Sequence, residues 1–169
     1  SHWYSGSKYD VPVEVAERLF EIPNTIAVKW ASPSTENFIE GVQKFRSRAA
    51  VIDNGPIPIF GHILGCSAFI SHVPNYYPHH AWRVWDLMEE ERYQEAQRVY
   101  DEFMVPYTEL IDKVGAATAG EGVFVRPGLM AAGLPAGYSR LPSRDDAITD
   151  EVRDGFKRLL ESQVEAAVS

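Results

Sequence analysis

The stretch PNTIAVKW, residues 23–30, is short, carries β-branched side chains and opens on a turn-forming Pro-Asn pair. These features predict a strand over residues 25–30. Successive side chains of a strand point to opposite faces, so three large apolar side chains share one face: Ile26, Val28 and Trp30. That face is predicted to pack against helices. Lys29 then points from the other face, at the carboxyl end of the strand.

Working outward from this strand, the first half of the chain alternates short apolar runs with helical periodicity. Strands are predicted at residues 25–30, 49–52 and 68–71, and helices at residues 11–20, 35–46 and 59–64. Asp10 and Ser34 are expected to cap the first two helices, and Gly65 to end the third. Trp3-Tyr4 is expected to end an earlier strand. This βαβαβ order with short loops is typical of a parallel sheet or barrel.

The second half changes character, because long amphipathic patterns replace the β-like runs. Helices are predicted at residues 79–89, 93–114, 124–132 and 150–164. We expect half-barrel βα units over residues 1–76, and the last barrel helix plus a helical extension over residues 77–169, all in one domain. A complete eight-stranded barrel needs about 250 residues, so the chain has room for about four strand units. It starts without methionine, as expected of a chain cut from a longer one.

Composition restricts the classes of function. The net charge is −8, and the 16 Lys and Arg residues form no basic stripe, which argues against binding nucleic acid. No apolar run approaches the ~20 residues of a membrane helix. The single cysteine, Cys66, favours a reducing, cytoplasmic setting, and its small apolar surroundings favour a buried structural thiol over a nucleophile. The spacing of His72, His79 and His80 does not match a zinc site, so no metal is expected.

Lys29 is the residue best suited to act as a nucleophile. An amine surrounded by apolar groups loses hydration, which favours its neutral, nucleophilic form. Such an amine attacks a ketone to form an iminium, which withdraws electrons from the neighbouring carbon. The alternative is a lysine at the rim of the sheet that pairs with a carboxylate. The pattern alone leaves both open.

The motifs around this strand resemble those of the dihydrodipicolinate synthase/N-acetylneuraminate lyase family. The stretch 23–29 is similar to the family's "PNI-apolar-G-apolar-K", and Ile52-Asp53-Asn54 takes the place of its "S-G-D". Leu64-Gly65, Phe69-Ile70-Ser71 and Asn75 resemble the "L-G…G-V-I-S…N" around the last barrel strand, and Glu95-Ala96 with Pro106 resembles the tail's "EA…P" helix. The matches run through nearly the whole chain.

The resemblance implies the carboxyl-terminal half of a (β/α)8 barrel, about strands 5–8, followed by a helical extension. It further implies a class I aldolase, lyase or dehydratase that acts on a pyruvate-type 2-oxo acid. In that reading Lys29 forms the Schiff base and Tyr4 relays a proton. Asp53 and Ile70 stand where the family presents backbone carbonyls to the substrate. No cofactor is implied, and the expected partners are further copies of the chain, as a tetramer, and the missing amino-terminal half-barrel.

Three positions depart from the family pattern: Trp30 follows the lysine in place of glutamate, and Asp53 and Ala68 replace glycines. These departures favour a sugar-acid or hydroxy-acid aldolase or dehydratase over dihydrodipicolinate synthase itself. They also support a second hypothesis, in which the chain is a catalytically inactive relative or a half-barrel that serves as a binding or assembly module.

Overall fold

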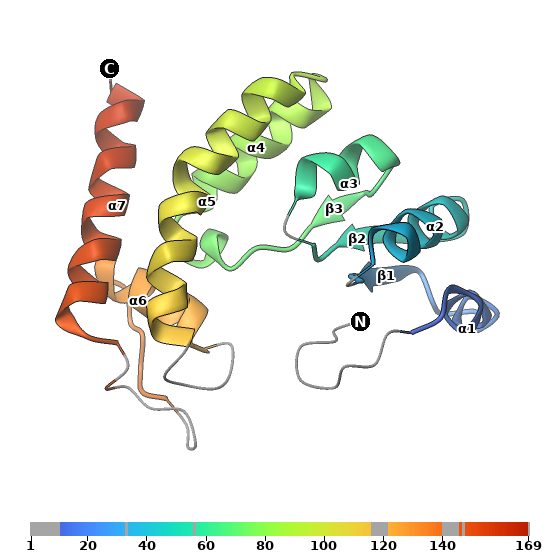
Figure 1. The fold of residues 1–169 in the computed structure, drawn as a ribbon, viewed down its shortest axis with the longest axis horizontal. Coiled ribbons are helices and arrows are strands. Elements are labelled where there is room, and N and C mark those ends of the chain that lie inside the picture. Colours follow the sequence, from blue (N-terminus) through green and yellow to red (C-terminus); the bar gives the residue numbers. More distant parts are fainter. Residues whose placement is uncertain are drawn as a thin grey trace. The chain divides into compact units, whose positions relative to one another are not determined.

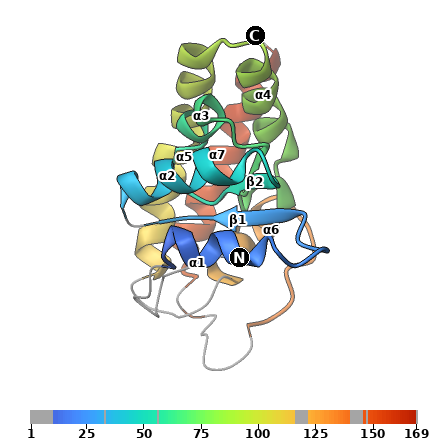
Figure 2. The ribbon, with the colours of Figure 1, turned by 90° about the vertical axis from the view of Figure 1, so that its right-hand side faces the viewer.

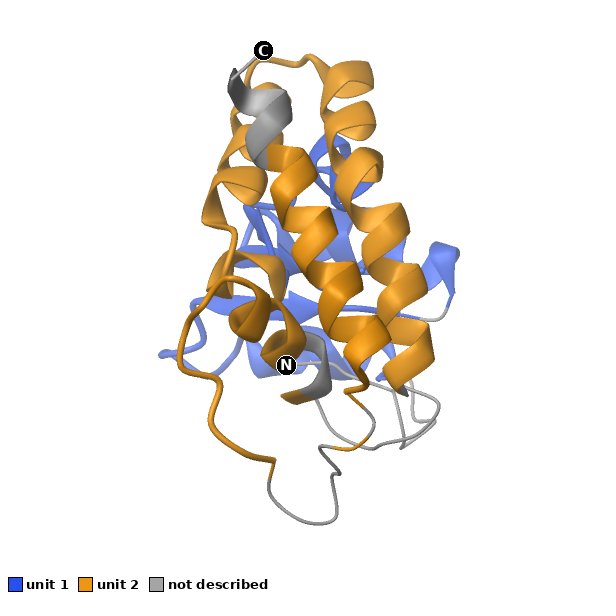
Figure 3. Ribbon diagram, turned by 90° about the vertical axis from the view of Figure 1, so that its left-hand side faces the viewer, with its two compact units in different colours: residues 1–71 blue, residues 72–169 orange. Residues whose placement is uncertain are grey.

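The computed structural model describes residues 11–32, 34–55, 57–115, 122–139, 146 and 148–168 (Figure 1). The chain divides into two compact units, residues 1–71 and residues 72–169 (Figure 3). The expected division into half-barrel units over residues 1–76 and a helical extension over residues 77–169, in one domain, stays a prediction. Among the helices of the described residues, none is long and apolar enough to cross a membrane.

The first unit contains a parallel sheet of three strands in the order β1-β2-β3. The strands and the helices are β1 (Ala27–Trp30), β2 (Ala50–Asp53), β3 (Ala68–Phe69), α1 (Val13–Leu19), α2 (Thr35–Phe45) and α3 (Pro58–Leu64). Helix α2 lies against β1 and β2, and α1 lies against α2 (Figure 1 and Figure 2). The predicted α/β order is confirmed. The strand expected at Trp3-Tyr4 and the cap expected at Asp10 lie outside the described residues, and the half-barrel stays a prediction.

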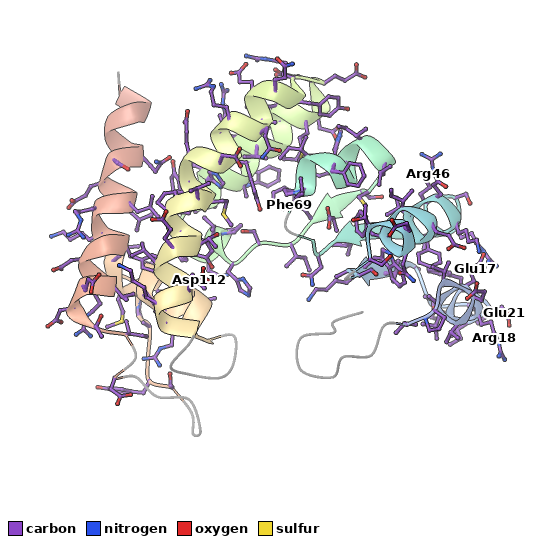
Figure 4. All side chains as sticks on the ribbon, in the orientation of Figure 1. Glu17, Arg18, Glu21, Arg46, Phe69 and Asp112 are labelled. Atoms are coloured by element: carbon purple, nitrogen blue, oxygen red, sulfur yellow. The ribbon has the colours of Figure 1, made fainter. Side chains whose placement is uncertain are left out.

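Local signals set the helix ends of this unit. The Ser34 hydroxyl accepts a hydrogen bond from the Asn37 N–H at 3.2 Å, as expected of an N-cap. Gly65 ends α3 with φ 101°, a left-handed conformation that glycine adopts without strain. The Arg46 guanidinium, labelled in Figure 4, donates to the Leu64 carbonyl at 3.1 Å and so ties the end of α2 to the end of α3.

Trp30 lies at the centre of the core of the first unit. It is 1% exposed, and its ring meets the Phe45 ring edge-on at 5.0 Å between centroids. The buried members of the core are Val13, Ala16, Trp30, Phe38, Val42, Phe45, Val51 and Cys66, with Val28 packed against them. The prediction that Val28 and Trp30 face the helices is confirmed. The prediction for Ile26 is wrong: this side chain is 79% exposed, because β1 begins only at Ala27 and Ile26 precedes the pleat.

Gly41 of α2 should not accept a side chain. A Cβ there would lie 2.5 Å from two atoms of the Trp30 indole ring, which has no room to move. We expect Gly41→Ala to lower the free energy of unfolding by about 1–3 kcal/mol, the usual cost of overpacking a filled core. Urea unfolding followed by tryptophan fluorescence measures this. Gly122→Ala is the control, because its Cβ meets only ordinary contacts, with Arg126 Cδ at 3.8 Å. Equal stability of the two variants would contradict the packing argument.

The second unit is helical. Its elements are η1 (Val73–Asn75), α4 (Pro78–Glu89), α5 (Tyr93–Gly115), α6 (Gly122–Ala131) and α7 (Asp150–Val168). Helix α4 pairs with α5, and α7 packs on both α5 and α6 (Figure 1). The four long helices agree with the predicted ranges to within a few residues, and the short turn η1 was not predicted. Four of the ten buried side chains of the core between these helices are aromatic: Tyr76, Phe103, Tyr107 and Phe156.

The turn between α4 and α5 carries a strained residue. Glu91 has φ 60°, in the left-handed region that is costly for a residue with a Cβ. The Arg92 N–H donates to the Leu87 carbonyl and the Glu91 N–H to the Met88 carbonyl, both at 2.9 Å, which is the hydrogen-bond pattern of a glycine-terminated helix.

Glu91→Gly is therefore expected to raise the free energy of unfolding by about 0.5–1 kcal/mol, because glycine adopts this conformation without a steric penalty. Glu109→Gly, inside α5 and exposed, is the control. It should lower stability by about 1 kcal/mol, since glycine weakens a helix interior. Thermal melts followed by circular dichroism compare the two, and a destabilised Glu91→Gly would refute the strain argument.

Candidate active site

The strand register sorts the side chains at the carboxyl end of the sheet into two faces. Lys29 pairs with Ile52, and Ile52 pairs with Ala68, so these three residues form one row across the sheet. The next row is made of Trp30, Asp53 and Phe69, the last of which is labelled on β3 in Figure 4. Neighbouring rows of a parallel sheet point to opposite faces. The row of Lys29 therefore lies on the face opposite the helix-covered core.

Lys29 is half-buried on that face, with the half-buried, apolar Ile52 beside it on β2 and Ala68 one strand further along the row. Among the described residues, no carboxylate comes within ion-pair distance of its Nζ; Lys44, by comparison, pairs with Glu40 at 2.8 Å. Within the part of the chain that is described, the surroundings of Lys29 differ from those of a rim lysine paired with a carboxylate. An amine among apolar groups is suited to nucleophilic chemistry on a carbonyl.

Asp53 lies on the opposite face from Lys29 and is buried, with 2% exposure. Its Oδ1 accepts the Gly55 N–H at 2.5 Å, and a Cβ on Gly61 would lie 2.1 Å from its Oδ2. Burial raises the pKa of this carboxyl from 3.8 to about 6, because the charged form loses water, while the Gly55 N–H partly offsets the rise. The Asp53 carboxylate thus faces the interior between β2 and α3. Only the backbone of Asp53 borders the row of Lys29, so the predicted role of this residue depends on its carbonyl.

The Asp53 carbonyl accepts the Ile70 N–H at 2.9 Å, which extends the β2–β3 ladder past the end of β3. Ile70 is 42% exposed. The substrate-binding roles of Asp53 and Ile70 stay predictions. Tyr4, the expected proton relay, lies outside the described residues.

Cys66 belongs to the core of the first unit, with 6% exposure. Burial, and secondly the nearby charge of Asp53, raise the pKa of its thiol from 9.0 to about 12. Since the thiolate is the reactive form, this thiol is inert near neutral pH. The prediction of a buried structural thiol is confirmed.

The described residues contain no group of three or more His, Cys, Asp or Glu side chains that could hold a metal ion. Of the three histidines considered as zinc ligands, His80 is buried. Its Nε2 lies 3.2 Å from the Val99 carbonyl, and its ring packs on Phe103 at 4.8 Å between centroids. His80 therefore contributes to the packing of α4 on α5.

Comparison with known proteins supports the resemblance at the level of the fold. The structure matches a dihydrodipicolinate synthase from Bacillus anthracis over 94% of this chain, with a TM-score of 0.75 and 21% identity. A putative dihydrodipicolinate synthase from Thermus thermophilus matches over 98%, with a TM-score of 0.72 and 25% identity. The chain has the fold of the dihydrodipicolinate synthase/N-acetylneuraminate lyase family. An N-acetylneuraminate lyase from Fusobacterium nucleatum, complexed with pyruvate, shares this fold over 91% of the chain, with a TM-score of 0.68 and 17% identity.

The family's fold is only partly present. The chain spans about half the length of the matched structures: 52%, 55% and 50% of the three in the same order. This agrees with the expected carboxyl-terminal half. No protein-family model matches the sequence, and neither does any curated protein.

Sequence reasoning passed over one residue beside Lys29. Asn54 follows β2 directly, and its N–H donates to the Trp30 carbonyl at 3.0 Å, so the ladder continues through it. It lies two residues after Ile52 and therefore on the face of Lys29. The sequence shows Asn54 in the Asp53-Asn54-Gly55 turn. Only the register of β2 against β1 shows that it lies on the same face as Lys29.

Proposed function

We propose that this chain takes part in the cleavage, formation or dehydration of a 2-oxo acid of the pyruvate type, as a class I lyase or aldolase, with Lys29 as the Schiff-base residue. The observation that carries the proposal is the position of Lys29. It stands at the carboxyl end of a parallel strand, beside the apolar Ile52, on the face away from the core. Catalytic groups of barrel enzymes come from this end of the strands.

The proposed aldolase chemistry needs no cofactor, because the lysine itself provides the electron sink. The neutral Nζ attacks C2 of the 2-oxo acid, and loss of water gives an iminium. In a 4-hydroxy-2-oxo acid the C3–C4 bond then breaks, its electron pair moves toward the iminium nitrogen to form an enamine, and the C4 hydroxyl gives up its proton as C4 becomes an aldehyde. Protonation of C3 and addition of water release pyruvate and restore the amine. Tyr4 is the group proposed to take and return the proton.

The proposal includes a half-barrel architecture that a missing amino-terminal half completes, assembly with further copies of the chain, and a cytoplasmic setting. Two observations support parts of it. The matched structures are about twice as long as this chain, and the single cysteine, Cys66, is buried and in no disulfide.

Incubation with pyruvate followed by borohydride reduction tests the proposal. Reduction converts an imine into a stable secondary amine, which peptide mass spectrometry locates. We expect the adduct on the peptide that contains Lys29. If no adduct forms with pyruvate or other 2-oxo acids, even after an amino-terminal half-barrel is supplied, the enzymatic proposal fails.

The second candidate function is that of a non-catalytic relative or half-barrel that acts as a binding or assembly module. The observation in its favour is Asp53, which replaces a family glycine and places a buried carboxylate under α3. Complementation distinguishes the two functions: an enzyme fragment gains carbonyl reactivity with its missing half, and an inert module gains only solubility.

A further inference from the structure

Asn54-Gly55 is a chemically labile pair at the end of β2. Asparagine is thermolabile, because the backbone nitrogen of the next residue can attack its side-chain amide. Glycine hinders this attack least, since it has no side chain and its backbone turns freely. The other three asparagines of the sequence precede threonine, phenylalanine and tyrosine. The pair 54–55 is therefore the position of this chain most prone to deamidation.

Deamidation consumes one water and releases one ammonia. The Gly55 N–H loses its proton to solvent, and the nitrogen forms a bond to Cγ of Asn54. The Cγ–Nδ2 bond breaks as Nδ2 takes up a proton and leaves as ammonia, so a five-membered succinimide ring remains. Water then opens the ring at one of its two carbonyls and yields aspartate or, when the original main-chain amide opens, isoaspartate. No oxidation or reduction takes place.

The structure restrains the nitrogen that would attack. The Gly55 N–H donates to Asp53 Oδ1 at 2.5 Å. Asp53 and Asn54 point to opposite faces of the sheet, so this bond directs the N–H away from the Asn54 amide. The carboxylate also opposes loss of the amide proton, because the resulting anion would place a second negative charge beside the first.

Packing keeps the Asp53 carboxylate in this position. Asp53 is 2% exposed, and its Oδ2 occupies the space where a Cβ on Gly61 would lie, at 2.1 Å. The Asn54 N–H donates to the Trp30 carbonyl at 3.0 Å, which fixes the backbone on the other side of the labile pair. Among the described residues, no group forms a hydrogen bond with the Asn54 side-chain amide. The restraint on the reaction therefore acts on the attacking nitrogen.

We propose that the Asp53 carboxylate protects Asn54-Gly55 from deamidation by holding the Gly55 N–H. This assigns a function to a carboxylate whose burial is otherwise unfavourable. Isoaspartate at residue 54 would add a methylene to the main chain within the β1–β2 ladder, and either product would put a new carboxylate on the face of Lys29. The protection itself is independent of any chemistry at Lys29.

Ageing of the 169-residue chain at neutral pH, below its melting transition, tests the proposal. Peptide mass spectrometry follows the conversion of Asn54, with fragment ions that separate residue 53 from residue 54. We expect Asp53→Ala to deamidate at Asn54 about ten-fold faster or more, because a hydrogen bond to a charged acceptor is among the stronger ones in proteins. Asp53→Asn keeps an uncharged acceptor and should be accelerated by a smaller factor.

Two comparisons distinguish protection by Asp53 from general stability of the fold. Val42→Ala is the control, because it leaves a cavity in the core of the same unit and keeps residues 53–55 unchanged. It should deamidate more slowly than Asp53→Ala. Faster deamidation of Asp53→Asn than of the unaltered chain, at equal or higher melting temperature, supports the proposal. Equal rates in the unaltered chain and Asp53→Ala overturn it, and so does a Val42→Ala rate as high as that of Asp53→Ala at matched stability.

Discussion

Lys29→Ala is expected to lose the borohydride-stable pyruvate adduct completely. Only a neutral amine forms an imine, and alanine has none. The substitution sits on the half-buried face of β1 away from the core, so the stability of the first unit should change little. The readout is the mass of the peptide that contains residue 29, measured with and without pyruvate before reduction.

Lys44→Ala is the matched control. Lys44 lies on α2 and forms ion pairs with Glu40 at 2.8 Å and Glu17 at 3.6 Å. A paired, protonated amine is a poor nucleophile, so this variant should keep the full adduct. If Lys29→Ala retained the adduct, or if Lys44→Ala lost it, the signal would come from non-specific reductive amination of surface lysines and the assignment of Lys29 would be wrong.

Asp53→Asn is expected to change both the size and the pH dependence of stability. The folded-state pKa of Asp53, about 6, lies above its ordinary value of 3.8 because burial removes water from the charged form. The folded protein therefore holds this proton more tightly than the unfolded chain does. The contribution of this group to stability is greatest below about pH 4, falls as the pH rises to about 6, and is constant above that.

The pKa difference corresponds to about 3 kcal/mol at neutral pH, at 1.36 kcal/mol per unit. Asparagine cannot ionise, but its buried NH2 group needs a partner, which costs about 1–2 kcal/mol. We therefore expect Asp53→Asn to raise the free energy of unfolding by about 1–2 kcal/mol at neutral pH, with a gain that shrinks to nothing or reverses at about pH 4.

Urea unfolding across this pH range provides the measurement. Asp112→Asn is the control: Asp112 is an exposed carboxylate on α5 (Figure 4), so this variant makes the same substitution outside the core. A parallel pH dependence of the unaltered chain and Asp53→Asn would show that Asp53 is not the group responsible. Asp53→Asn should also loosen the turn around Asn54, because the Gly55 N–H then loses its charged acceptor.

Most of the secondary structure could be predicted because its signals are local. The Ser34 cap and the Gly65 terminus were identified from single residues, since each acts on backbone groups within a few positions. The two-residue period of β1 correctly placed Trp30 in the core and Lys29 on the other face. Ile26 was misassigned because periodicity does not mark where a strand begins.

The candidate site could be predicted only in part. Lys29 was identified from its strand, and the resemblance around it suggested the chemistry. Asp53 and Ile70 were chosen by analogy for their carbonyls, but the side chain of Asp53 turned out to be buried beneath Gly61. The sequence does not show that the absence of a side chain at Gly61 makes room for the Asp53 carboxylate. Gly61 and Asp53 are eight positions apart, and only the packing of α3 on the sheet brings them together.

The sequence by itself determined the order and approximate limits of the strands and helices and the family fold, because these depend on local periodicity, capping and short motifs. The role of Lys29 as the nucleophile stays a prediction. The tertiary structure decided which residues share a row with Lys29. That row depends on the register among β1, β2 and β3, and a shift of one residue would exchange Asp53 with Asn54 on the face of the lysine. Register is set by hydrogen bonds and core packing between segments more than fifteen residues apart, and no local pattern encodes it.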